Sequence, residues 1–350
     1  MRYLLFLLVP IFICCNIEGA GNQLVVGFAQ ISLRDAPGKH SNVLRTLALD
    51  EKVTDLKEVS KFESSVMYND RRYQSPWIKV KTADNEVGWV LGSALRPVQN
   101  DTAWLFQKRM QCYFGPSVTE RRNRLVETGL RGDRVKNDEG LAAAYRESLA
   151  LRDTIARLLA NRVDPNEAGF QPDFAWLQGV LPGFIVQYTA EGTQPYLFAD
   201  FRIWREKSRK SSYHQDDAYF NTCFTAFPND SIESFFPAWK FQLSDSDAAS
   251  QLGTGVHLKM LRQIEAALST GDLFKPELMA LKESVVEDIA GKNVRYWQPK
   301  ELILNELNQI VHSDLSVLDS RDRAVLQARL AMFEAPEANG ISVNLRSGLE

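Results

Sequence analysis

A change of hydrophobic period near residue 100 divides this sequence into two parts that require different folds. From residue 24 to 98, short runs rich in Val, Ile, Leu and aromatic residues are separated by turn-forming Pro, Gly, Asp and Asn. From residue 102 onward, apolar residues recur with helical spacing. We therefore predict a multidomain protein: a small all-β domain, a boundary within residues 96 to 101, and a larger, mainly α-helical domain.

The strand pattern is clearest in the stretch "PWIKVKTADNEVGWVLGSAL", which begins at residue 76. Ile78 and Val80 alternate with Lys79 and Lys81, which places one face of a strand inward and the other in water. The polar "ADNE" then reverses the chain before a second apolar run. Residues 24 to 98 are long enough for a compact unit of five strands.

Three segments of this first part resemble the bacterial SH3-like domain, a small β-barrel. They read "GFAQISLRDAPG", "SNVLRTLALDEKVTDL" and "WIKVKTADNEVGWVLGSAL", and they follow the family's turn, middle stretch and closing "W-x-x-V…G-x-x-G-W-V" in order. The resemblance covers residues 24 to 98, about a fifth of the chain. It implies a binding role at the cell envelope, with peptidoglycan or an envelope peptide or protein as the ligand.

The sequence departs from the family pattern at residues 57 to 76, "KEVSKFESSVMYNDRRYQSP", where many members have only a short loop. We expect this insertion either to build a groove beside Trp77 or to cap one. Flat aromatic rings suit peptides and sugar faces because they bury area at low entropic cost. The candidate ligand contacts are Tyr68, Tyr73, Trp77, Arg71 and Arg72. Trp89 is expected to be barrel packing instead.

The first twenty residues, "MRYLLFLLVPIFICCNIEGA", have the form of a secretory signal peptide, with one Arg before a short apolar run. Two processing routes stay open. Gly19 and Ala20 offer small residues to an ordinary signal peptidase, whereas Cys15 is a candidate lipidation site preceded by a poor lipobox. We expect an exported protein of the periplasm or cell envelope, with membrane contact only through such a lipid anchor.

The second part, residues 102 to 335, is expected to be an all-α domain, followed by a tail at 336 to 350. Helices are predicted over 141 to 159, 219 to 227, 258 to 268, 276 to 290, 299 to 311 and 319 to 333. The segment around "AEGT", residues 190 to 193, is ambiguous between short helices and a hairpin. Cys112 and Cys223 could pair as a disulfide in an oxidising compartment, or remain free core residues.

No catalytic motif emerges from the chain. Its four histidines stand apart from any paired metal-binding spacing, and no phosphate-binding glycine motif occurs, so neither a metal nor another cofactor is expected. The formal net charge of -3 argues against nucleic acid as a partner. A basic run at 202 to 210 is open to an anionic partner or to solvent. Two functions stay open: a noncatalytic envelope binding or adaptor protein, and a cell-wall hydrolase whose catalytic site lies in the helical part.

Overall fold

The chain folds into two compact units, Met1–Pro116 and Ser117–Glu350. The computed structural model describes residues 22–99, 101, 103–130, 137–160, 174–189, 194–211 and 214–345. The division falls inside a helix, beside Gly115, whose backbone angles of φ 79° and ψ 169° are not helical. It therefore lies beyond the 96 to 101 segment at which the sequence places the boundary.

The first unit is a seven-stranded antiparallel sheet in the order β3-β2-β6-β5-β4-β1-β7. Its elements are β1 (Gln23–Val26), β2 (Ile31–Arg34), β3 (Val43–Leu47), β4 (Lys52–Tyr68), β5 (Arg71–Thr82), β6 (Val87–Leu91), the 3-10 turn η2 (Gly92–Ala94), β7 (Leu95–Pro97) and the start of α1 (Trp104–Arg124). Two strands more than the predicted five are present, and β4 and β5 are much longer than the rest.

The core of the first unit lies on one face of this sheet. It is formed by buried residues from all seven strands and η2: Leu24, Val26, Leu33, Leu47, Val53, Ile78, Val80, Val90, Ala94 and Leu95. The inward direction predicted for Ile78 and Val80 is confirmed. Gly88 permits close strand packing, because a Cβ there would lie 2.7 Å from the Arg34 carbonyl oxygen. Asn85 adopts a φ of 64° in the turn before β6, a conformation that asparagine tolerates.

The second unit combines helices with two small hairpins. Its elements are the end of α1, the π-helical η3 (Leu125–Leu130), α2 (Asp138–Ala160), the 3-10 turn η5 (Ala175–Leu177), β8 (Phe184–Thr189), β9 (Gln194–Ala199), α3 (Phe201–Ser208), α4 (Gln215–Ala226), β10 (Lys240–Ser244), β11 (Asp247–Ser250), α5 (Val256–Leu268), α6 (Lys275–Ala290), α7 (Lys300–Val311) and α8 (Ser320–Met332). The two antiparallel pairs, β8-β9 and β10-β11, make this unit mainly helical rather than all-α.

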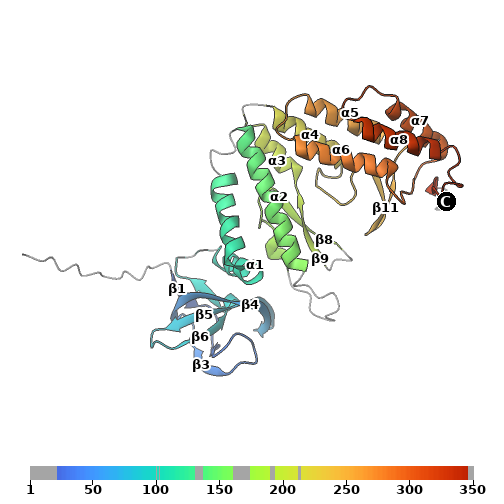
Figure 1. Ribbon diagram of the computed structural model, residues 1–350. Helices are drawn as coiled ribbons and strands as arrows, with labels where there is room; N and C mark the ends of the chain where they lie inside the picture. The colour runs from blue at the N-terminus through green and yellow to red at the C-terminus, as the bar shows by residue number, and fades with distance from the viewer. Residues whose placement is uncertain are drawn as a thin grey trace, which may run out of the picture. The chain divides into compact units, whose positions relative to one another are not determined.

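An aromatic core holds the earlier helices of this unit together. Tyr145 of α2 packs edge-on against Trp204 of α3, with ring centroids 4.9 Å apart, and Tyr219 of α4 stacks on Phe274 at 4.5 Å. Helices α5 to α8 form a second group, in which α5 contacts α6 and α8 contacts both α6 and α7 (Figure 1). The described part of the predicted tail is anchored at two residues: Ile341 is buried, and the Ser342 carbonyl accepts from the Tyr296 N–H.

Candidate functional site

The inserted residues 57 to 76 form most of a long β-hairpin, which we call the hairpin arm. Strands β4 and β5 pair from Glu63 opposite Pro76 out to Tyr68 opposite Arg71. Asn69 and Asp70 make the two-residue turn with positive φ angles of 48° and 59°, the combination that matches the twist of a hairpin. The insertion is therefore a paired extension of the sheet.

A cluster of three aromatic rings fixes the tip of the hairpin arm to the connection between β1 and β2. Phe28 stacks on Tyr68 with a centroid separation of 4.5 Å and an interplanar angle of 8°, and Tyr73 meets Phe28 edge-on at 4.7 Å. The backbone N–H of Ala29 donates to the Tyr68 hydroxyl at 2.9 Å. Tyr68 and Tyr73 are thus brought together as the sequence suggested. Phe28, the third ring, was missed by sequence reasoning although it stands in the "GFAQ" of the family-like turn.

Two arginines follow the turn at the end of the arm. Because successive strand residues point to opposite faces, Arg71 lies on the face of Tyr68 and Tyr73, and Arg72 lies on the face of Met67. Arg71 and Arg72 are both exposed, and the Arg72 Nε donates to the Ser65 hydroxyl at 2.5 Å. Met67 is 64% exposed, and Asp70 in the turn contributes one opposite charge. One face of the tip therefore offers a guanidinium group beside aromatic rings, and the other face offers a guanidinium group beside Met67. We refer to Met67, Tyr68, Arg71, Arg72 and Tyr73 as the hairpin-tip surface.

Trp77 does not belong to that surface, which corrects the expectation that it contacts a ligand. Its side chain is only 3% exposed, and its indole N–H donates to the Ser64 hydroxyl at 2.8 Å. The Ser60 hydroxyl accepts from its backbone N–H at 2.9 Å. Both serines come from the inserted part of β4, so the insertion supplies the partners of both N–H groups, and the Arg34 guanidinium lies 5.9 Å from the ring centroid. Trp89, which was expected to be packed, is half-buried, and the Lys79 Nζ lies 5.8 Å from the centroid of its ring.

Buried ion pairs hold the first turns of α1 on the arm. Lys108 Nζ lies 2.6 Å from Asp55, and Arg109 lies 3.0 Å from Glu63, with three of these four side chains almost fully buried. The Tyr113 hydroxyl also donates to Glu63 at 3.2 Å. Burial raises the pKa of Glu63 against the opposing effect of Arg109. These pairs explain why the first compact unit extends to residue 116.

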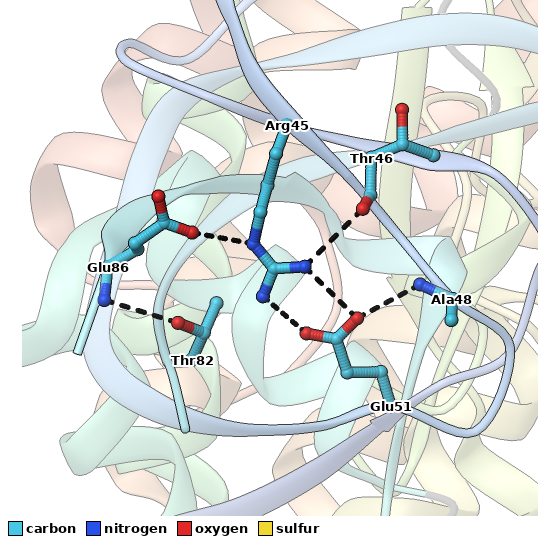
Figure 2. A network of polar contacts seen from close by, with 6 residues as sticks. All are labelled: Arg45, Thr46, Ala48, Glu51, Thr82 and Glu86. Atoms are coloured by element: carbon cyan, nitrogen blue, oxygen red, sulfur yellow. Dashed lines mark hydrogen bonds and ion pairs between the residues drawn. The ribbon is translucent and has the colours of Figure 1, made fainter. Parts of the chain in front are cut away.

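A second charged network ties the edge strand β3 to two turns (Figure 2). The Arg45 guanidinium donates to Glu51 at 2.5 Å and to Glu86 at 2.6 Å, and Glu51 also accepts from the Ala48 N–H at 3.0 Å. The hydrogen bond from Arg45 lowers the pKa of Glu51. Because all three charged side chains already have partners inside the network, we assign it to the stability of the sheet and not to ligand contact.

In the second unit several charged side chains are paired with each other. In the basic run, Arg202 lies 2.7 Å from Asp200 and Lys210 lies 3.0 Å from Glu206. The Asp217 carboxylate accepts from Ser208 at 2.7 Å and contacts His214 at 3.1 Å. Among the described residues no group of three or more His, Cys, Asp or Glu side chains is placed to hold a metal ion.

Asp216 is the carboxyl of this region with the largest pKa change. Its side chain is fully buried in the first turn of α4. Burial raises its pKa from 3.8 to about 6, and the neighbouring Asp138 carboxylate adds to the shift. A carboxyl whose pKa is higher in the folded than in the unfolded state favours folding at low pH. That contribution is lost as the pH rises from 3.8 to about 6.

We therefore expect Asp216→Asn to stabilise the protein at pH 7, by up to about 3 kcal/mol, and to have little effect at pH 4. The amide is uncharged and keeps the oxygen that accepts from the Asp217 N–H. Thermal unfolding at both pH values measures the difference. The exposed Asp314→Asn is the control, expected to change stability by less than about 0.5 kcal/mol. A destabilised Asp216→Asn protein at pH 7 would contradict this account.

The remaining expectations concern the cysteines and the N-terminus. Cys112 and Cys223 are both buried free thiols in the structure, and their disulfide stays a prediction.

Cys15 and the signal peptide at residues 1 to 20 lie outside the described residues. Within the described ranges, none of the helices has the length and apolar character that crossing a membrane requires.

Comparison with known proteins gives no relative for this chain: no protein-family model, no curated protein and no solved structure matches it.

Proposed function

We propose that this chain is a noncatalytic binding protein of the cell envelope, in which an SH3-like barrel carries the recognition surface on its hairpin arm and the helical unit mediates further interactions. The observation that carries the proposal is the hairpin-tip surface, where Tyr68 and Tyr73 pack on the face that carries the exposed Arg71, with the exposed Arg72 on the opposite face. Export through the N-terminal signal belongs to the same proposal, with either ordinary cleavage near Gly19 and Ala20 or lipid attachment at Cys15.

The short connection between β3 and β4 supports a closed barrel. Only residues 48 to 51 join these strands, yet β2, β6 and β5 lie between them in the sheet order. Across a flat sheet, four strand spacings would amount to about 19 Å, slightly more than a fully extended chain of this length can span, about 18 Å. This comparison favours a curled sheet, in which the two strand ends meet. Residues of both edge strands, Leu47 and Leu95, also share one core.

The ligand we favour is an extended, carboxylate-bearing peptide, such as the peptide part of peptidoglycan. Guanidinium groups bind carboxylates with paired hydrogen bonds, and Arg71 and Arg72 present them at the end of the arm. The rings and Met67 offer apolar surface for the peptide's side chains. Since the stacked rings and the Tyr68 hydrogen bond already order the tip, little entropy remains to be lost on binding.

Cosedimentation with purified peptidoglycan tests the proposal. The full-length mature protein is expected to pellet with the polymer, and Arg71→Ala/Arg72→Ala is expected to raise the apparent Kd about tenfold, because two charged contacts are removed. Lys259→Ala/Lys292→Ala is the matched control: it removes two exposed positive charges from the second unit and should leave the Kd unchanged. The proposal fails if wild-type protein stays in the supernatant, or if both double variants bind as wild type does.

A further inference from the structure

A pocket of about 310 Å³ lies at the other end of the same two strands, near the beginning of β4. It is lined by Asn22, Gln23, Thr54, Asp55, Leu56, Lys57 and Lys81. Thr54 pairs with Lys81 in the ladder, whereas Tyr68 pairs with Arg71 at the far end, so this pocket is separate from the hairpin-tip surface. Its volume is at the lower end of the range of small-ligand sites.

The charge balance of the pocket is positive. Lys57 and Lys81 have no ion-pair partner among the described residues, whereas the single acidic side chain of the lining, Asp55, is already paired with Lys108 at 2.6 Å. The Trp104 indole N–H donates to the same Asp55 carboxylate at 3.3 Å. Two ammonium groups are therefore left for a negatively charged ligand. The Thr54 hydroxyl and the Asn22 and Gln23 amides add hydrogen-bonding capacity.

The backbone at Lys57 is held in an uncommon conformation. Its φ is 65°, in the left-handed region that non-glycine residues rarely adopt. Its N–H donates to the Asp55 Oδ1 at 2.7 Å, inside the interval between Asp55 and Val59 where the ladder shifts register. Such a bulge redirects side chains at the edge of a site, and backbone strain of this kind clusters at functional positions. The bulge thus places Lys57 on the pocket that Lys81 lines from β5.

We propose that this pocket binds the oxyanion of a small ligand, with Lys57 and Lys81 as its charged contacts. A carboxylate at the end of a short peptide and a phosphate group share the required chemistry, because both present negatively charged oxygens to point charges. Leu56 supplies an apolar wall beside the charges. The inference is independent of the hairpin-tip surface, since no residue is shared between the two sites.

Isothermal titration of the full-length mature protein tests the pocket with three compounds: N-acetyl-Ala-Ala with a free carboxylate, its C-terminal amide, and inorganic phosphate. Binding of the acid and not of the amide identifies a carboxylate site. Binding of phosphate alone identifies a phosphate site. Either result supports the proposal when Lys57→Asn and Lys81→Gln each weaken binding at least about tenfold. Asparagine is chosen at residue 57 because it tolerates the positive φ.

Lys52→Gln is the matched control, since Lys52 is an exposed lysine at the start of β4 that does not line the pocket. It should bind within about twofold of wild type, and thermal unfolding confirms that all three variants are folded. The proposal is overturned if none of the compounds binds. It is equally overturned if Lys57→Asn and Lys81→Gln bind as Lys52→Gln does. Neither result bears on peptidoglycan binding through Arg71 and Arg72, which the double-arginine variant tests separately.

Discussion

Replacing Lys108 by methionine is expected to destabilise the first unit by about 3 to 5 kcal/mol. Lys108 Nζ lies 2.6 Å from Asp55, and the two side chains are only 6% and 8% exposed. Methionine fills a similar volume but leaves the Asp55 carboxylate buried without its counter-charge. Hydrogen exchange of amides in β4 and β5 of the full chain measures the loss directly, because protection there reports the local free energy of opening.

Two comparisons separate this effect from the loss of an ordinary ion pair. Arg96 and Asp50 are 2.6 Å apart but 64% exposed on each side, so Arg96→Ala should cost less than about 1 kcal/mol. The double variant Asp55→Asn/Lys108→Met removes both charges and should recover much of the stability lost in Lys108→Met. If Lys108→Met and Arg96→Ala lowered stability by the same amount, burial of the ion pair would not determine how much it contributes.

Local sequence patterns predicted the elements whose formation depends on local chemistry. The helix expected over 276 to 290 is α6 (Lys275–Ala290), and the helix expected over 319 to 333 is α8 (Ser320–Met332). Both have clear starting signals, Pro276 at the first turn of α6 and Asp319 as the N-cap of α8. The hairpin alternative around residues 190 to 193 is also confirmed, since β8 and β9 flank them as antiparallel strands.

What the sequence could not predict depends on contacts between distant residues. The backbone and indole N–H groups of the buried Trp77 donate to Ser60 and Ser64 of the insertion, and nothing in "PWIKVKT" indicates these partners. The first unit extends into α1 because Lys108 forms an ion pair with Asp55, which lies 53 positions earlier in the sequence. The hairpin arm itself escaped prediction because its register shifts after Asp55 and again after Val59, which removes the strict alternation expected of a strand.

One local sequence signal, the Asn69-Asp70 dipeptide, could have predicted the hairpin turn at the candidate site. The dipeptide Asn69-Asp70 stands between residues that pair directly, Tyr68 and Arg71, and both members accept positive φ more readily than most residues. It marks a two-residue hairpin turn, and from it the neighbouring positions of Tyr68 and Arg71 follow. The placement of Phe28 against Tyr68 does not follow, since it requires the β1–β2 connection to approach the arm.

Glu306 of α7 is the position in the second unit where a single substitution should be most damaging. Its carboxylate, on a residue only 4% exposed, accepts backbone hydrogen bonds from Gly253 at 2.6 Å, Gly255 at 2.8 Å and Leu258 at 3.1 Å. These N–H groups lie at the start of α5, where a helix leaves backbone donors without internal partners and where a negative charge is favoured by the helix dipole. Glu306 thus joins α7 to α5 through the backbone.

Glu306→Ala is expected to lower the free energy of unfolding of the second unit by about 4 kcal/mol, because three buried or half-buried donors lose one charged acceptor. Glu306→Gln should be intermediate, since the amide keeps one oxygen acceptor and turns an NH₂ group toward the remaining donors. Glu301→Ala, at an exposed position of the same helix, should cost less than about 0.5 kcal/mol. Hydrogen exchange of the first turn of α5 gives the local readout. If Glu306→Ala leaves those amides as protected as Glu301→Ala does, the carboxylate is not what stabilises the start of α5.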